Sequence, residues 1–141
     1  MSKLKILILC TGNSCRSQMA EGWFRHLYGD LLDVYSAGIE SHGLNQRAVK
    51  VMAEAGVDIS GHRSKLITEL NETHFDLVLT VCDSARENCP WFPGKVKHIH
   101  RSFNDPPALT KSLTGEDNIL TVYRRVRDEI REYVENFEVL V

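Results

Sequence analysis

A short apolar run and the loop that follows it constrain the fold of this chain most strongly. Residues 4–9 read LKILIL, which has the length and the near-continuous hydrophobicity of a strand buried on both faces of a parallel sheet. After the loop CTGNSCRS, apolar side chains recur at the three- and four-residue spacing of an amphipathic helix: Met19, Ala20, Trp23, Phe24 and Leu27. Gly29 follows, where a helix end favours a left-handed residue. This segment predicts a strand, a loop and a helix in succession.

The alternation of strands and helices continues along the chain. A second strand fits residues 32–37, and a second helix, N-capped by Asn45, fits residues 46–56. Residues 75–81 and 96–100 are the third and fourth strand candidates. The clearest apolar stripe predicts a long last helix that covers the sheet: Ile119, Val122, Tyr123, Val126, Ile130, Tyr133, Val134 and Phe137. Strands that alternate with helices indicate parallel βαβ units, and hence an α/β fold arranged as a three-layer sandwich.

The composition is that of an ordinary globular protein, and it limits the partners. The 141 residues suit one domain over residues 1–141, with 43% hydrophobic and 26% charged residues. A formal net charge of −2 provides no broad basic field, so neither a nucleic acid nor a membrane is expected as a partner, and any anion site must be local. No apolar run approaches the ~20 residues that cross a bilayer, and no leader with a cleavage site is visible. We therefore expect a cytoplasmic protein, by default a monomer.

Four cysteines are the residues whose chemistry needs an explanation: Cys10, Cys15, Cys82 and Cys89. They are too few for a disulfide-dense secreted scaffold, and in a reducing cytoplasm such cysteines serve catalysis, metal binding or simple burial. Structural zinc sites favour ligands two to four residues apart, whereas four and six residues lie between the members of the two pairs here. The spacing therefore argues against zinc.

Cys10 stands at the end of the first predicted strand, where open α/β sheets bind their ligands. Gly12 and Asn13 can take the unusual backbone angles that turn successive N–H groups into one concavity. The helix that begins near Arg16 adds its positive end, and the guanidinium supplies a two-pronged donor. We therefore expect a tetrahedral oxyanion to bind the loop residues Thr11, Gly12, Asn13, Ser14, Cys15 and Arg16.

The same surroundings favour the thiolate of Cys10. An ordinary cysteine has a pKa of about 8.5 and is mostly protonated at neutral pH. Loop amides, the helix end and the Ser17 hydroxyl all stabilise the thiolate, so Cys10 is predicted to be a nucleophile; the alternative is a buried cysteine in a glycine turn. Displacement at phosphorus or arsenic also needs an acid, for which Asp105 in FNDPP is the best candidate, although Asp-Pro turns are common. Cys15 is expected to be passive.

Cys82 directly follows the strand candidate FDLVLTV, so we expect it at the same sheet edge as Cys10. Cys89 comes after the polar segment DSAREN, which can form a short helix. If residues 82–89 were helical throughout, the two α-carbons would lie about 10.5 Å apart, whereas a disulfide needs about 4.4–6.8 Å. A Cys82–Cys89 disulfide therefore requires the segment to unwind or bend. The alternative is two separate, buried, reduced cysteines.

Four segments, in their order and spacing, closely resemble the thioredoxin-coupled arsenate reductases, which share the fold of the low-molecular-weight tyrosine phosphatases. The segments are LILCTGNSCRSQMAEGWFRH, YSAGIESHGLNQRAV, LVLTVCDSARENCP and FNDPP, and the likeness spans essentially the whole chain. CTGNSCRS with Asp105 would suit the phosphatases equally, whereas Cys82 and Cys89 indicate the reductases, because the phosphatases lack this pair. The resemblance implies a four-stranded parallel sheet flanked by helices.

The resemblance also implies a role for each residue of the first loop. Cys10 would attack arsenate, with phosphate or sulfate as competing anions. Arg16 and the loop amides would hold the oxyanion, and Ser17 would assist the thiolate. Asp105 would protonate the leaving oxygen.

Two further cysteines carry the oxidation onward in the reductases that the chain resembles. Cys82 would attack Cys10 and release arsenite, Cys89 would then attack Cys82, and thioredoxin would reduce the resulting disulfide. No metal or organic cofactor takes part in this electron transfer. Two alternatives stay open: a low-molecular-weight phosphotyrosine-type phosphatase that uses Cys10, Arg16 and Asp105, and a non-catalytic redox switch.

One position departs from the pattern of the family that the chain resembles. Some members bind potassium through residues that correspond to Asn13, Glu21 and Ser36, together with an acidic residue where this chain has Lys65. A lysine there would repel a cation. We hypothesise that the Lys65 ammonium takes the place of the ion, which predicts indifference to potassium; the alternative is a lysine that points into solvent.

Overall fold

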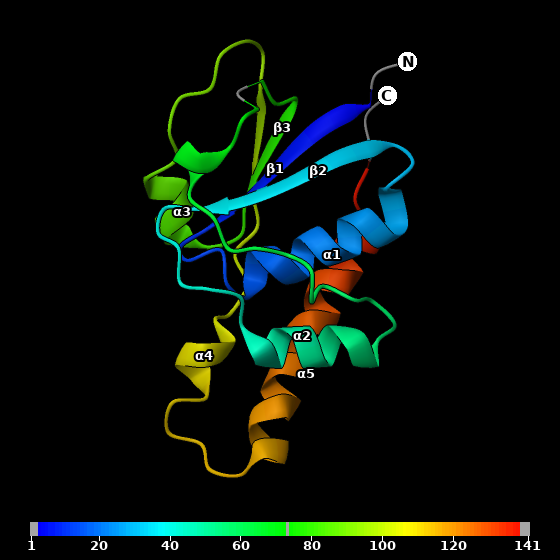
Figure 1. The fold of residues 1–141 in the computed structure, drawn as a ribbon, viewed down its shortest axis with the longest axis vertical. Helices are drawn as coiled ribbons and strands as arrows, with labels where there is room; N and C mark the ends of the chain where they lie inside the picture. The colour runs from blue at the N-terminus through cyan, green and yellow to red at the C-terminus, as the bar shows by residue number, and fades with distance from the viewer. Residues whose placement is uncertain (1–2, 73, 139–141) are drawn as a thin grey trace.

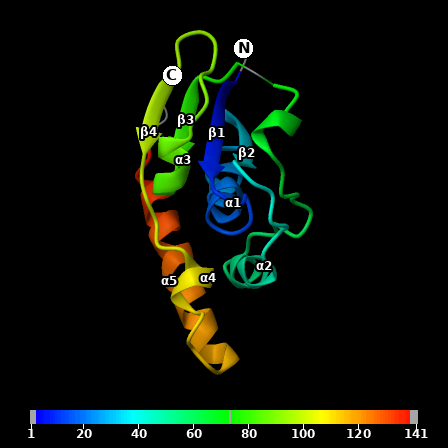
Figure 2. The same cartoon turned by 90° about the vertical axis from the view of Figure 1, so that its left-hand side faces the viewer.

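Four parallel strands form the sheet in the computed structural model, which describes residues 3–72 and 74–138 (Figure 1). β1 (Leu4–Cys10) lies between β2 (Leu32–Gly38) and β3 (Leu77–Thr80), and β4 (Lys97–His100) lies beyond β3. Figure 2 shows the four strands side by side in the order β2-β1-β3-β4. Because every neighbouring pair is parallel, the carboxyl ends of all four strands meet at one edge of the sheet.

Helices flank this sheet. In the described part of the chain the α-helices are α1 (Arg16–Tyr28), α2 (Gln46–Glu54), α3 (Asp83–Glu87), α4 (Pro106–Leu109) and α5 (Glu116–Glu135), and a 3-10 turn covers Ile67–Glu69. In Figure 1, α1, α2 and α5 gather on one side of the sheet, and α3 lies near the end toward which the strands run. The predicted four-stranded parallel sheet flanked by helices is confirmed. None of the described helices is long and apolar enough to cross a membrane.

Glycine ends two of these helices in different ways. Gly29 has φ −59° and ψ −23°, so the expectation of a left-handed residue there is wrong. A Cβ at that position would lie 2.5 Å from the carbonyl oxygen of Arg25, and the close approach is what requires glycine. Gly56 has φ +88° and follows α2, which ends at Glu54 rather than at the glycine itself. Asn45 caps α2 as predicted, because its side-chain oxygen accepts an N–H of the first turn at 3.0 Å.

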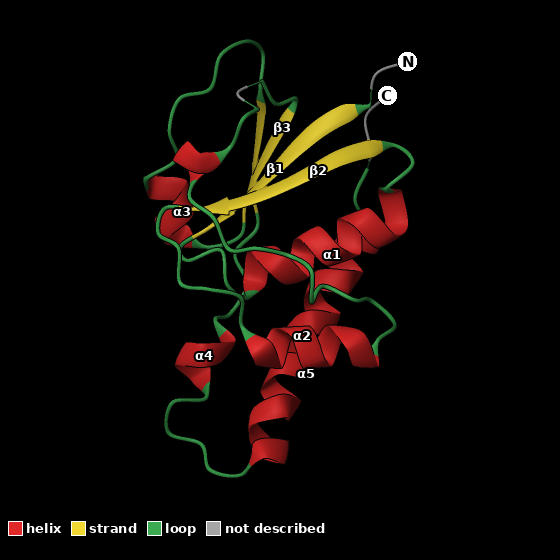
Figure 3. Cartoon of the chain, viewed as in Figure 1, coloured by secondary structure: helices red, strands yellow, loops and turns green. Residues whose placement is uncertain are grey.

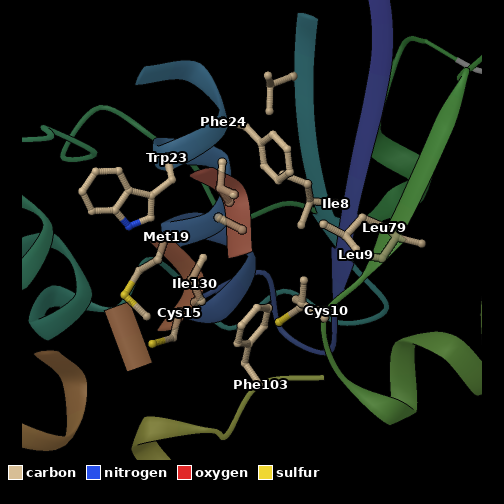
Figure 4. Close-up of a cluster of buried hydrophobic side chains, with 14 of the residues drawn as sticks. Ile8, Leu9, Cys10, Cys15, Met19, Trp23, Phe24, Leu79, Phe103 and Ile130 are labelled. Atoms are coloured by element: carbon tan, nitrogen blue, oxygen red, sulfur yellow. The ribbon is translucent and has the colours of Figure 1, made fainter. Parts of the chain in front are cut away.

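The core reaches from the sheet to the candidate site. The central residues of β1, from Ile6 to Leu9, are fully buried. Figure 4 shows that the same cluster extends down to Cys10 and Cys15, with the ring of Phe103 near them. Figure 3 shows loops gathered where the strands end. The loop after β1 is therefore built on a rigid part of the fold, which sets the position of Cys10.

Candidate functional site

Backbone hydrogen bonds from the segment after β2 hold the loop between β1 and α1. Residues 39–45 donate backbone N–H groups, at 2.8–3.3 Å, to the carbonyl oxygens of Cys10, Thr11, Gly12 and Ser14. Asn13 adopts the left-handed conformation, with φ +47°, that lets the loop turn sharply. These carbonyl groups are thus bonded to the neighbouring segment, and the N-terminus of α1 directly follows the loop.

A cavity of about 370 Å³ lies on the concave side of this loop. The predicted residues that line it are Cys10, Thr11, Gly12, Ser14, Cys15, Arg16 and Asp105. His42, Asn45 and Pro107 complete its wall. A larger hollow of about 430 Å³ lies between residues 101–104 and α5, but none of the predicted site residues lines it. The cavity at Cys10 is therefore the candidate site.

Arg16, the first residue of α1, reaches into this cavity. Its Nη1 donates to the carbonyl oxygen of Phe103 at 3.1 Å, and its Nη2 lies 3.8 Å from Oδ2 of Asp105. Its Nε is buried and has no hydrogen-bond partner among the described residues. A buried N–H group without an acceptor is costly, and a bound oxyanion would supply that acceptor.

Asp105 lies over the same cavity. It precedes Pro106, which starts α4, but its side chain makes no capping hydrogen bond with that helix. The carboxyl group is 41% exposed and faces Arg16. The predicted acid is therefore placed within reach of an oxyanion bound to the arginine.

The thiol of Cys10, at the floor of the cavity, is strongly biased toward the thiolate. A hydrogen bond from the Cys82 thiol is the largest effect that lowers the pKa of Cys10. The charge of Arg16 and the hydroxyl and amide groups of Ser17 lower it further, and together these effects outweigh burial and hold the pKa of Cys10 well below its ordinary value. This environment is the one that a nucleophilic cysteine needs.

Cys82, which follows β3, is the thiol partner of that nucleophile. Donation of a hydrogen bond to Cys10 raises the pKa of Cys82, and burial raises it further. Two contacts of the Cys82 sulfur lower its pKa and so oppose this rise. The sulfur lies 3.3 Å from Oγ1 of Thr11 and 3.4 Å from the amide nitrogen of Ala85. The two strand-end cysteines thus meet as expected, and their opposite pKa shifts favour a thiolate on Cys10 and a thiol on Cys82.

Cys15 lines the cavity without the electrostatic support that Cys10 receives. Burial raises the pKa of Cys15, and the neighbouring charge of Cys10 raises it further. Its thiol therefore stays protonated at neutral pH, which agrees with a passive role.

Asn13 is not among the residues that line the cavity, and its side chain bonds within the protein. Its Nδ2 donates to the hydroxyl oxygens of Ser17 at 2.9 Å and Ser36 at 3.0 Å, and its Oδ1 accepts the N–H of Lys65 at 2.9 Å. Since Ser17 Oγ accepts from this amide, its own proton is available to Cys10. Asn13 therefore shapes the loop and orients Ser17.

α3 separates the second pair of cysteines. Cys82 is the N-cap of this helix, and Cys89 follows the C-cap residue Asn88, so the short helix predicted between them is confirmed. The Cys89 sulfur contacts the carbonyl oxygen of Pro90 at 3.6 Å, and partial burial raises the pKa of its thiol. All four cysteines are reduced in this structure.

The residues that correspond to a potassium site are hydrogen-bonded to one another and to Arg25. The buried carboxylate of Glu21 accepts a hydrogen bond from Ser36 and pairs with Nε of Arg25 at 2.9 Å. The Lys65 ammonium donates to the carbonyl oxygen of Arg63 at 3.0 Å and is attracted by the Glu21 charge, although burial lowers the pKa of this lysine. Arg25 thus pairs directly with the Glu21 carboxylate, and Lys65 adds a positive charge in its neighbourhood. The described residues contain no cluster of three or more histidine, cysteine or acidic side chains that could hold a metal.

Two residues in the wall of the cavity have no signal in the local sequence. His42 and Asn45 belong to the connection between β2 and α2, which returns to the carboxyl edge of the sheet; that rule of topology is the only signal for them. A Cβ at residue 12 would lie 2.4 Å from Nδ1 of His42. Gly12 does not have a positive φ, contrary to expectation. Glycine is needed at this position because a side chain there would collide with His42.

Known proteins that match this chain identify its family. Residues 5–139 match the family described as low molecular weight phosphotyrosine protein phosphatase. The arsenate reductase of Bacillus licheniformis is 50% identical over 137 residues, which cover 97% of this chain and 96% of that protein. The solved structure of an arsenate reductase in the phosphate binding state has 33% identity and a TM-score of 0.78, covering 94% of this chain and 95% of the other. A thioredoxin-dependent arsenate reductase of Corynebacterium glutamicum has 26% identity and a TM-score of 0.65, covering 94% of this chain and 61% of the other. The chain therefore belongs to the low molecular weight phosphotyrosine protein phosphatase family.

Proposed function

We propose that this protein reduces arsenate to arsenite through Cys10, Cys82 and Cys89, and that thioredoxin regenerates it. The observation that carries the proposal is the Cys82 thiol held against the Cys10 thiolate. A phosphatase needs a nucleophile, an anion cradle and an acid, whereas a second thiol beside the nucleophile supplies two electrons. The relatives named arsenate reductase support the reaction, and the thioredoxin-dependent neighbour supports the reductant.

The first step is attack of the Cys10 thiolate on arsenic. The loop N–H groups and Arg16 hold the oxyanion, for which phosphate and sulfate compete because they have the same tetrahedral shape. A sulfur–arsenic bond forms and an arsenic–oxygen bond breaks. Asp105 gives a proton to the leaving hydroxide, which departs as water.

The second step depends on the Cys82 thiol, which must lose its proton before it can attack. Once the Cys10 sulfur is bonded to arsenic, it no longer carries the charge that raises the pKa of Cys82, while the contacts with Thr11 and Ala85 still favour the Cys82 thiolate. Cys82 then loses its proton, which leaves with the arsenite, and attacks the Cys10 sulfur. The sulfur–arsenic bond breaks with its electron pair left on arsenic, so As(V) becomes As(III) and leaves as arsenite.

The third step moves the oxidation away from the cavity. The Cys89 thiolate attacks Cys82, a Cys82–Cys89 disulfide forms, and Cys10 leaves as a thiolate ready for another arsenate. Helical spacing keeps the two α-carbons well beyond the about 4.4–6.8 Å of a disulfide, so α3 must unwind. A thioredoxin dithiol then reduces this disulfide in a reducing cytoplasm. One chain supplies all three cysteines, so a monomer is sufficient.

Two serine variants test the order of these steps. Cys89→Ser is expected to release one equivalent of arsenite in a single turnover and to lose two protons by mass spectrometry, with a Cys10–Cys82 disulfide, while turnover with thioredoxin falls to background. Cys82→Ser is expected to release no arsenite at all. Unchanged multiple turnover in Cys89→Ser would contradict the relay.

The same assays separate the two alternatives. A phosphatase would hydrolyse phosphate esters equally well in the unmodified protein and in Cys89→Ser, and would release no arsenite in either of them. A non-catalytic redox switch would release no arsenite and would hydrolyse no ester, although it would still form a Cys82–Cys89 disulfide with an added oxidant.

A further inference from the structure

His100, the last residue of β4, uses both ring nitrogens on the turn that carries Cys82. Its Nδ1 lies 2.7 Å from Oγ1 of Thr80, and its Nε2 lies 3.0 Å from Oδ1 of Asp83. Thr80 ends β3 and Asp83 begins α3, so the ring ties the chain on both sides of Cys82. We infer that His100 is a positioning residue that braces this turn and thereby holds the Cys82 sulfur against Cys10. The inference rests on the proposed function.

The brace is anchored in the sheet. Thr80 and His100 are paired residues of neighbouring strands, and the backbone N–H of Arg101 donates to the Thr80 carbonyl oxygen at 2.9 Å. The N–H of Phe103 donates to the carbonyl oxygen of Val81 at 3.1 Å. A neutral imidazole satisfies both side-chain contacts at once, because Nε2–H donates to the aspartate while Nδ1 accepts the threonine hydroxyl proton. The brace therefore needs no charge on the ring.

Few other polar contacts hold the turn that carries Cys82. Within the described chain, the contact between His100 and Asp83 is the only hydrogen bond or ion pair between a side chain of α3 and a side chain outside the helix. A helix of five residues has little stability of its own. The contacts of Cys82 with Thr11 and Ala85 are made by the sulfur itself and change when that sulfur reacts. The His100 contacts are made by neighbouring residues, so they do not depend on the state of the Cys82 sulfur before it attacks Cys10.

Loss of the brace has two measurable consequences for Cys10. The charged and polar groups that stabilise its thiolate are Cys82 from the turn and Arg16 and Ser17 from α1, and Asp105 from the start of α4 faces the same arginine. If the turn loosens, only the contribution of Cys82 is lost, so the Cys10 pKa rises toward its ordinary value without reaching it. The Cys82 sulfur also spends less time in position to attack, so formation of the Cys10–Cys82 disulfide slows.

The test uses His100→Ala in a Cys89→Ser background, in which the relay stops at the Cys10–Cys82 disulfide. Arsenite release in a single turnover is expected to slow by about tenfold or more, since small misplacements of a reacting group have effects of this size. The midpoint of the pH profile for Cys10 alkylation by iodoacetamide is expected to move upward. His98→Ala, on an exposed residue of the same strand, is the matched control and should change neither measurement.

Variants that remove one contact each show whether the contacts of His100 with Thr80 and Asp83 act together. Thr80→Val and Asp83→Ala each remove one tie, and each is expected to give a smaller effect than His100→Ala. Phosphate protection of Cys10 against alkylation should stay within about twofold of the control, because the anion loop is untouched. If His100→Ala does not fold, His100→Gln and His100→Asn replace it, because their amide groups can reach Asp83 and Thr80 respectively.

The outcomes separate this inference from the proposed function. The inference would be wrong if His100→Ala released arsenite at the same rate as His98→Ala and had the same alkylation midpoint. If the Cys89→Ser protein itself releases no arsenite and forms no disulfide, the proposed function fails. The alkylation midpoint then still decides whether His100 positions Cys82.

Discussion

At the scale of single residues, the anion loop depends on the fit between Gly12 and His42. A Cβ at residue 12 would lie 2.4 Å from Nδ1 of the histidine, 2.8 Å from its Cγ and 3.1 Å from its Cβ, so rotation of the ring cannot relieve the contact. The histidine is itself held in place. The backbone N–H of His42 donates to the Gly12 carbonyl oxygen at 3.1 Å, and Nε2 of the ring lies 3.3 Å from Oε1 of Glu40. Any side chain at residue 12 must therefore move the wall of the cavity or the loop.

Gly12→Ala is accordingly expected to weaken phosphate binding by about tenfold or more, since overpacking costs about 1–3 kcal/mol. Isothermal titration calorimetry measures this affinity. In a His42→Ala background the same substitution should cost much less, because the ring that it strikes is gone. Gly43→Ala is the matched control: Gly43 has φ +81° and open space around it, so alanine strains the backbone without pressing on the cavity. Additive effects of Gly12→Ala and His42→Ala would contradict the argument.

At the scale of secondary-structure elements, hydrophobic spacing predicts which segments form strands and helices, because burial of one face creates that spacing. β1 and α1 follow from residues 4–9 and from the stripe that begins at Met19. The bounds are less predictable even where burial is complete: β3 covers only Leu77–Thr80 of the predicted residues 75–81, whereas the half-exposed β4, Lys97–His100, nearly matches residues 96–100.

The residues predicted for the site share one strand end, one loop or one motif. His42 and His100 could not be predicted in this way, because each contributes through contacts with segments that lie well apart from it in the sequence. Gly29 shows the opposite case: a local rule predicts the left-handed region, and a contact with the carbonyl oxygen of Arg25 decides otherwise.

α3 is the element that the relay must rearrange. Its hydrogen bonds run from the N–H of Arg86 to the carbonyl oxygen of Cys82 at 3.2 Å and from the N–H of Asn88 to that of Ser84 at 3.0 Å. Oxidation to the Cys82–Cys89 disulfide is expected to break both bonds, because the ends of the segment must come together. Amide hydrogen exchange in the reduced and oxidised protein checks this. The amides in the middle of α5 are the internal control, and unchanged protection in α3 after oxidation would show that the helix does not unwind.

At the scale of the whole molecule, the buried carboxylate of Glu21 joins segments that are distant in the sequence. It pairs with Arg25 in α1, accepts from Ser36 in β2 and lies 3.5 Å from Nε2 of His62. Asn13 connects this cluster to the anion loop through its bond to the same serine. A buried carboxylate needs compensating positive charge, and removal of one partner from such a group is strongly destabilising. The source of that charge therefore affects both the stability of the fold and the shape of the loop.

Potassium is expected to have no specific effect on this protein, because Arg25 and Lys65 already provide positive charge near Glu21. With sodium or potassium as the sole monovalent cation at equal ionic strength, neither kcat/KM for arsenate nor Tm should differ. Lys65→Asp removes the ammonium and adds a carboxylate, so potassium should raise the Tm of this variant more than sodium does. A cation at ten times its Kd stabilises a fold by about 1.4 kcal/mol, which calorimetry resolves. Lys65→Gln is the neutral control, and clear activation of the unmodified protein by potassium would mean that the lysine does not replace the ion.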